Sequence, residues 1–206
     1  MSRLEAEKAV AVDRSICVFC GSSMGTNQAY AEAARRVGSA IAANRLGLVY
    51  GGGQVGLMGV VADATLAAGG RVLGVIPDPL ATKEIAHHGL SELIVVPGMH
   101  ERKAKMAERA AGFLTLPGGV GTLEEFFEIL TWSVLGLHRK PIGILNVEGY
   151  YDPLLAFLDD SVARGFFRPE HRRLIVVSDD PESLVADLLD REVPRPPRRW
   201  IEADET

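Results

Sequence analysis

A chain of 206 residues can bury a substantial hydrophobic core, as one large domain or as two small ones. Its composition, 47% hydrophobic and 24% charged, is that of a globular protein and excludes wholesale disorder. The net charge of −5 argues against a general nucleic-acid binder, and no apolar stretch approaches the ~20 residues of a membrane span.

Short apolar runs alternate with segments of helical periodicity along the chain. The first segment, residues 1–14, is charged and alanine-rich and has no signal-peptide core, which indicates a cytoplasmic protein. We expect strands over residues 16–19, 48–50, 72–76, 93–96, 113–116, 142–145 and 174–177. Helices are expected after most of them, over residues 30–41, 53–69, 99–110, 123–134, 151–164 and 181–189.

This alternation predicts an α/β fold, a Rossmann-like doubly wound and mostly parallel sheet with helices on both faces. We expect a single catalytic domain over residues 15–191, because no boundary interrupts the pattern, and a flexible tail over residues 192–206. Ligands of such sheets bind beyond the carboxyl ends of the strands. Three turns rich in glycine or serine lie there, at residues 21–23, 51–53 and 118–121.

The two cysteines, Cys17 and Cys20, have the C-x-x-C spacing of redox motifs. Both lie in the apolar run of residues 16–20, and in a strand positions three apart point to opposite faces and lie roughly 10 Å apart. A disulfide needs Cα atoms within about 7 Å. We therefore expect both thiols to be reduced.

The turn after the expected strand 113–116 has the features of a phosphate site. It reads Pro117-Gly118-Gly119-Val120-Gly121-Thr122-Leu123-Glu124-Glu125 and leads into a helix. Glycines let the backbone approach a ligand closely, and the free N–H groups and positive dipole of a helix start favour a phosphate. Simple anion binding gives no role to a pair of carboxylates one turn into the helix. Their presence points to chemistry beside the phosphate.

Residues 51–56 match the dinucleotide fingerprint G-x-G-x-x-G, and Asp78 follows at about the distance of a ribose-binding acid. One alternative is therefore an NAD-dependent oxidoreductase. However, the match follows the second expected strand, Asp78 lies between two prolines, and the second glycine turn is left unexplained. We interpret residues 51–53 as a turn that shapes the site and contacts a mononucleotide.

Arg102 and Lys103 lie on the expected helix 99–110, beside the inward face that Met99 and Met106 define. Their charges can face the site and engage an anionic nucleotide. Alternatively, both stems lie over the edge of the core while the charges remain in water. The spacing leaves both interpretations open.

Glu125 also has two interpretations. Thr122-x-x-Glu125 is a capping-box pattern, in which the glutamate only closes the start of a helix, and the pattern alone favours this. The same residue can instead reach into the site. The histidines show no H-E-x-x-H or other metal-binding spacing, so we expect a mechanism without a metal or an external cofactor.

Several motifs in chain order, from about Ser15 to Leu189, together resemble the Lonely Guy family, the cytokinin riboside 5′-monophosphate phosphoribohydrolases. The matching segments are Cys20-Gly21-Ser22-Ser23, Tyr50-Gly51-Gly52-Gly53, Gly56-Leu57-Met58-Gly59, Gly74-Val75-Ile76-Pro77, Met99-x-x-Arg102-Lys103-x-x-Met106, Pro117-Gly118-Gly119-x-Gly121-Thr122-x-x-Glu125, Thr131-Trp132, Leu135-Gly136-Leu137-His138 and Lys140-Pro141. The resemblance implies hydrolysis of the N-glycosidic bond of an N6-substituted AMP, which yields a free base (a cytokinin) and ribose 5-phosphate.

The resemblance also implies site residues. Arg102 and Glu125 match the catalytic pair of the family. The nucleotide-contacting positions are matched by Glu84, Met99, Lys103, Gly118, Gly119, Val120, Gly121, Thr122, Glu124 and Thr131, and we add Gly21 and Ser22 from the first turn. The sequence departs from the family pattern at two places. His87-His88-Gly89 differs from the usual family sequence near Glu84, and Val120 stands where many members have tyrosine.

The sequence also bears on two other functions and on a homodimer. Molybdenum-cofactor carrier proteins look similar, but the presence of both Arg102 and Glu125 argues against a carrier without catalysis. Family members have often been labelled lysine decarboxylases, but none of the five lysines lies in a sequence setting that suggests an aldimine with a cofactor.

A homodimer is predicted from the resemblance and from large apolar side chains at Phe126, Phe127, Trp132 and Leu135.

Overall fold

The structure is a computed structural model and describes residues 14–81 and 86–193. The expectations for the N-terminal segment, for Glu84 and for the end of the tail lie largely or wholly outside these residues. The described strands are β1 (Ser15–Phe19), β2 (Gly47–Tyr50), β3 (Arg71–Pro77), β4 (Glu92–Val96), β5 (Gly112–Thr115), β6 (Ile142–Leu145) and β7 (Ile175–Ser178). The long helices are α2 (Gln28–Ala43), α3 (Gly56–Ala67), α5 (Met99–Arg109), α6 (Val120–Val134), α7 (Asp152–Ala163) and α9 (Pro181–Leu188).

All seven described strands pair in parallel in one sheet, in the order β4-β3-β2-β1-β5-β6-β7. The order reverses between β1 and β5, and such a reversal is where doubly wound sheets bind their ligands. This confirms the predicted fold class. Three short helical turns were not expected, namely α4 (Asp78–Ala81), η1 (Val147–Gly149) and α8 (Pro169–Arg172).

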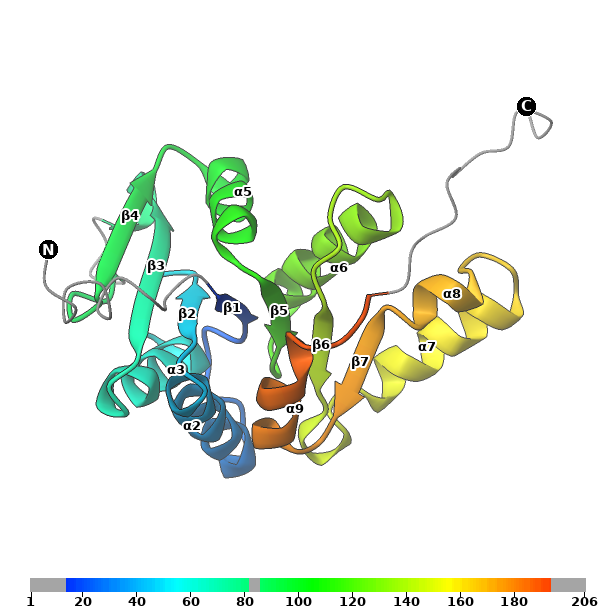
Figure 1. Cartoon of the computed structure of the whole chain (residues 1–206), viewed down its shortest axis with the longest axis horizontal. Helices are drawn as coiled ribbons and strands as arrows, with labels where there is room; N and C mark the ends of the chain where they lie inside the picture. Colours follow the sequence, from blue (N-terminus) through cyan, green and yellow to red (C-terminus); the bar gives the residue numbers. More distant parts are fainter. Residues whose placement is uncertain (1–13, 82–85, 194–206) are drawn as a thin grey trace, which may run out of the picture.

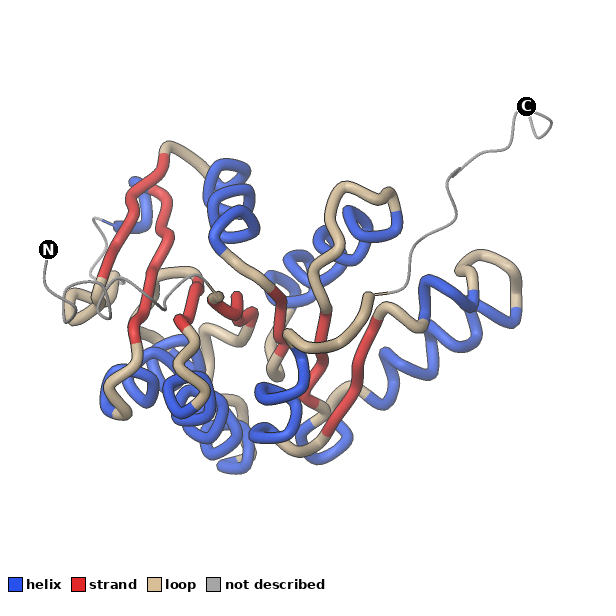
Figure 2. The backbone as a smooth tube through the Cα atoms, viewed as in Figure 1, coloured by secondary structure: helices blue, strands red, loops and turns tan. Residues whose placement is uncertain are grey.

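Helices cover both faces of the sheet (Figures 1 and 2). One core lies between the sheet and α2, α3 and α9, and the other between the sheet and α5, α6 and α7. The five inner strands β3, β2, β1, β5 and β6 are buried on both faces, which explains their continuous apolar runs, whereas the edge strands β4 and β7 are partly exposed. Over the described ranges, no helix combines the length and the apolar character needed to cross a bilayer.

The two cysteines occupy opposite faces of the sheet, as expected. Cys17 packs in the core beside α5 and α6, whereas Cys20 packs in the core beside α2 and α3. Both are free and buried, and burial raises the pKa of each thiol. The opposite orientation predicted from the strand geometry is confirmed, and it keeps the two thiols from bonding to each other.

Candidate active site

Two turns meet at the reversal point of the sheet. The turn after β1 contains Gly21, whose N–H donates to the carbonyl of Pro117 in the turn after β5 (3.0 Å). A Cβ on Gly118 would lie 2.8 Å from the nitrogen of Gly21 and would collide with Thr122, so this contact requires a glycine. Gly21, Ser22, Gly118 and Gly119 line one cavity of about 250 Å³. Two of the three sequence-predicted turns, at residues 21–23 and 118–121, are therefore brought together.

Helix α6 begins at this cavity. Gly119 is its N-cap, and no side chain in the described part of the protein caps it. The first bond of the helix runs from the N–H of Leu123 to the carbonyl of Gly119 (3.1 Å). The preceding N–H groups, at Val120, Gly121 and Thr122, have no partner within the helix and can donate to an anion.

The capping-box interpretation of Glu125 is wrong. The pattern requires Thr122 at the N-cap, but the helix already begins at Val120, so Thr122 lies inside it and is buried. Glu125 is therefore almost two turns into the helix. Its carboxylate points to Arg102 of α5, with Oε1 3.5 Å from Nη1.

Arg102 is held on three sides. Its Nε donates to the carbonyl of Val75 in β3 (3.1 Å) and its Nη2 to the carbonyl of Gly51 after β2 (3.4 Å). With Glu125 on the third side, only 12% of the arginine side chain is exposed. The interpretation that Arg102 keeps its charge in bulk water is therefore wrong.

Gly51 explains the glycine triplet after β2. A Cβ at this position would collide with Nη2 of Arg102. The missing side chain at Gly51 thus makes room for the guanidinium, which a sequence pattern cannot reveal because Arg102 lies far along the chain. The turn at residues 51–53 was expected to shape the site, and Gly51 does so by leaving space for the Arg102 side chain.

Burial dominates the electrostatics of Glu125, which is also 12% exposed. Loss of solvation raises the pKa of Glu125 to about 7, although the positive charge of Arg102 opposes the shift. A carboxyl group with this pKa changes its protonation near neutral pH. Strongly shifted groups in clefts are candidates for acid–base chemistry.

Lys103 joins α5 to α6. Its Nζ donates to Oε1 of Glu124 (2.5 Å) and to Oε1 of Glu128 (3.0 Å), and its side chain is 10% exposed. Two of the expected nucleotide contacts, Lys103 and Glu124, therefore bind each other. The tie keeps Arg102 and Glu125, their neighbours in sequence, facing each other.

Of the remaining expected residues, Met99 and Val120 lie beside this centre and Thr131 does not. Met99 begins α5 and is 44% exposed, so its expected place on the buried face of the helix is wrong. Its Sδ lies 3.8 Å from Nη1 of Arg102. The Val120 side chain is exposed at the start of α6. Thr131, further along α6, lines a separate cavity of about 420 Å³ with Phe127 and Phe166.

Sequence reasoning missed Tyr150. This residue follows η1 and lines the cavity of the two turns, where its hydroxyl donates to the carbonyl of Gly118 (2.7 Å). The contact spans 32 positions and belongs to no motif that we singled out. The signal present in the sequence was only a tyrosine pair after the strand that became β6.

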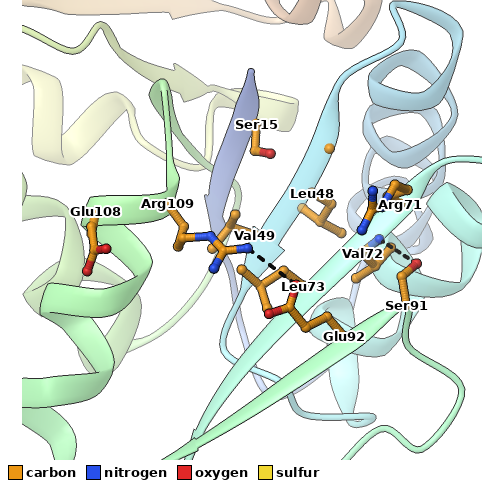
Figure 3. A pocket seen from close by; sticks show the side chains of 11 residues that line it. Ser15, Leu48, Val49, Arg71, Val72, Leu73, Ser91, Glu92, Glu108 and Arg109 are labelled. Carbon is orange, nitrogen blue, oxygen red and sulfur yellow. Dashed lines mark hydrogen bonds and ion pairs between the residues drawn. The ribbon is translucent and has the colours of Figure 1, made fainter. Parts of the chain in front are cut away.

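Another cavity, of about 420 Å³, lies at the opposite edge of the sheet (Figure 3). It is lined by the first residues of four strands, including Ser15 and Arg71, and by Arg109, which pairs with Glu92 (3.3 Å). Ligands of parallel sheets bind at the carboxyl edge instead. In the residues that the structure describes, no group of three His, Cys, Asp or Glu side chains is placed to hold a metal ion.

The chain is similar to named phosphoribohydrolases. It is 53% identical over 175 residues to a probable cytokinin riboside 5′-monophosphate phosphoribohydrolase of Oryza sativa subsp. japonica, covering 85% of this chain and 77% of that protein. It is 50% identical to a cytokinin riboside 5′-monophosphate phosphoribohydrolase of Arabidopsis thaliana, covering 87% and 82%, and 52% identical to that of Rhodococcoides fascians, covering 85% and 89%.

Solved structures share the fold at low identity. The molybdenum cofactor carrier protein of Chlamydomonas reinhardtii has a TM-score of 0.66 at 22% identity, over 87% of this chain and 99% of that one. A molybdenum cofactor binding protein of Rippkaea orientalis has a TM-score of 0.64 at 20% identity, over 84% and 94%. This likeness concerns the fold alone.

The fold and the site define a Rossmann-like α/β protein with a glycine turn, a helix start and an arginine–glutamate pair at the reversal point of its sheet. A family model described as "Possible lysine decarboxylase" matches residues 58–188. With the relatives above, this shows that the chain belongs to the Lonely Guy family, the cytokinin riboside 5′-monophosphate phosphoribohydrolases. The resemblance drawn from the motifs is confirmed.

Proposed function

We propose that this protein hydrolyses the N-glycosidic bond of adenosine 5′-monophosphates, including N6-substituted ones, to a free base and ribose 5-phosphate. The relatives at about 50% identity are named for this reaction. The observation that carries the proposal is the Arg102–Glu125 pair, 3.5 Å apart and nearly buried, beside the start of α6.

The phosphate group supplies the anchor. The N–H groups of Val120, Gly121 and Thr122 and the positive end of the α6 dipole favour the 5′-phosphate. Binding energy from this remote group positions the ribose against the reacting residues. Gly21, Ser22, Gly118 and Gly119 contribute the walls of the phosphate cavity.

Glu125 acts on the ribose. Cleavage of the bond between C1′ and the purine nitrogen passes through an oxocarbenium-like state, as in glycoside hydrolysis. The ionised carboxylate stabilises that positive charge and orients the water whose oxygen forms the new bond to C1′. The bonding electrons leave with the purine, which takes a proton to become the free base.

Arg102 orients the nucleotide and holds Glu125. Its guanidinium keeps its place because the carbonyls of Val75 and Gly51 accept two of its N–H groups. Its charge also favours the ionised form of Glu125 against the effect of burial. Met99, Lys103 and Glu124 complete the surroundings of the substrate in this proposal, together with Glu84, which lies outside the described residues. The expected contact Thr131 lines the separate cavity with Phe127 and Phe166 instead.

A decarboxylase that uses pyridoxal phosphate would need a lysine free to form an aldimine. Each lysine that the structure describes is engaged: Lys103 as above, Lys105 with Glu108 (2.6 Å), and Lys140 with the carbonyl of Ala107 (2.6 Å). These contacts favour the hydrolase over the activity in the description of the family model.

The phosphate cavity predicts strong discrimination between AMP and adenosine. We expect kcat/KM for adenosine to lie at least ~10²-fold below that for AMP, because the nucleoside lacks the group that positions the ribose. Release of adenine from both compounds, followed by chromatography, measures the ratio. Equal rates would show that the start of α6 contributes nothing and would refute the proposal.

We also propose a homodimer, formed through α6 and α7. Phe126, one basis of the expectation, is wholly buried in the core, but Phe166 and Leu137 are 89% and 70% exposed. Phe166 lines the apolar cavity between α6 and α7. Light scattering at micromolar concentration should give twice the mass of one chain, and Phe166→Asp should lower it. A monomeric mass for the unmodified protein would contradict the dimer.

A further inference from the structure

The turn after β6 brings an aromatic side chain to the phosphate cavity. Besides its hydrogen bond to the carbonyl of Gly118 (2.7 Å), Tyr150 packs edge-on against Tyr30 of α2, with ring centroids 5.5 Å apart. Its ring also meets Tyr151 edge-on at 4.9 Å. Rings on two sides therefore fix the direction of the Tyr150 hydroxyl.

The backbone of this turn is equally well defined. The side chain of Asn146 accepts from the N–H of Tyr151 (2.8 Å) and donates to Oδ1 of Asp152 (2.7 Å). Glu148 and Gly149 adopt left-handed conformations, with φ of 51° and 68°. A non-glycine residue in this region persists only where its surroundings enforce it. The turn thus places Tyr150 as a fixed donor.

The acceptor of this hydrogen bond lies in a peptide whose two residues restrict its orientation little by themselves. Gly118 and Gly119 flank it, and glycines reach both signs of φ at little cost. In a trans peptide the C=O and the following N–H point in opposite directions. Holding the carbonyl of Gly118 toward Tyr150 therefore fixes the direction of the N–H of Gly119. That N–H has no acceptor within the described residues.

We propose that Tyr150 is a positioning residue for the 5′-phosphate. Its hydroxyl holds the Gly118–Gly119 peptide so that the N–H of Gly119 joins the donors at the start of α6. In the opposite orientation, the carbonyl oxygen of Gly118 would face the phosphate and repel it. This inference rests on the proposed function, since it deepens the account of the same phosphate site.

Tyr150→Phe tests the role, because it removes the hydroxyl and keeps the ring contacts. Two quantities are measured: the Kd of ribose 5-phosphate by calorimetry, and KM and kcat for AMP. We expect the Kd and the KM to rise about five- to tenfold, the range for one lost hydrogen bond, with kcat within about twofold. A residue that only stabilised the fold would not produce this split.

Tyr151→Phe is the matched control. Its hydroxyl donates to the carbonyl of Leu116 (2.7 Å), at the strand end before the turn, and its side chain is wholly buried. We expect its Tm to fall while the Kd of ribose 5-phosphate stays within about twofold. An unchanged Kd in Tyr150→Phe, or an equal weakening in both variants, overturns the inference.

The binding measurement separates this inference from the proposed function. If the unmodified protein binds ribose 5-phosphate but releases no base from AMP, the proposed function fails while the two variants still decide the role of Tyr150. If the unmodified protein does not bind ribose 5-phosphate, Tyr150 has no phosphate to position and the inference is overturned directly.

Discussion

Glu125→Gln is expected to lower kcat for AMP by at least ~10²-fold, because the amide cannot carry the negative charge that stabilises the oxocarbenium-like state. The fold should survive. Burial raises the pKa of Glu125 to about 7, so ionisation is less favourable in the folded protein than in water. A neutral side chain of the same shape therefore removes little stability, and Tm and AMP binding should stay nearly unchanged.

Glu124→Gln is the control for this variant. Glu124 lies next in sequence and pairs with Lys103, but half of its side chain is exposed and it does not face Arg102. We expect a smaller loss of turnover. Near-normal turnover in Glu125→Gln would show that the glutamate is not the catalytic carboxylate.

The same carboxyl group sets the pH dependence of the unmodified enzyme. In the proposed mechanism its ionised form is the active one, and burial raises its pKa to about 7. Therefore kcat/KM should be highest above pH 7 and should fall toward tenfold per unit as the pH drops below it. This acid limb should be absent from the residual activity of Glu125→Gln.

Arg102→Ala is expected to reduce turnover to a similar or greater extent. The substitution removes the donor to the carbonyls of Val75 and Gly51 and the positive charge beside Glu125. We expect a loss of stability of about 1–3 kcal/mol from these contacts, measured by denaturant unfolding. Because Arg102 lowers the pKa of Glu125, any residual activity should also have its acid limb at higher pH.

Arg109→Ala provides the comparison on the same helix. Arg109 is exposed at the far end of α5 and pairs only with Glu92 among the contacts described. Removing it should leave both kcat and the pH profile unchanged. Equal losses in the two variants would mean that the positive charge of α5 acts at a distance, and the proposed role of Arg102 would be wrong.

The fold was predictable because its signals are local. The apolar run around Leu114 and the glycines that follow it predict a buried strand and a turn at one sheet edge, and parallel strands bring such turns together. The start of α6 could not be placed from pattern alone. Thr122-x-x-Glu125 fits a capping box, and only the helix beginning at Val120 excludes it.

The contacts within the site could not be predicted because they join distant segments. The orientation of Arg102 depends on a carbonyl 51 positions away and on the absence of a side chain at Gly51. Tyr150 reaches Gly118 across 32 positions. Sequence motifs describe residues a few positions apart, so contacts across 51 and 32 positions cannot be recognised from them. The resemblance to a family supplied Arg102 and Glu125, but only the structure shows what holds them.

The most direct test of the account is the identity of the products that the unmodified protein releases from AMP and from isopentenyl-AMP. Chromatography with mass detection should find free base and ribose 5-phosphate in equal amounts, and the N6-substituted substrate should give the N6-substituted base. Release of inorganic phosphate with the nucleoside, or retention of the intact nucleotide without cleavage, would contradict the hydrolase and leave a phosphatase or a nucleotide carrier in its place.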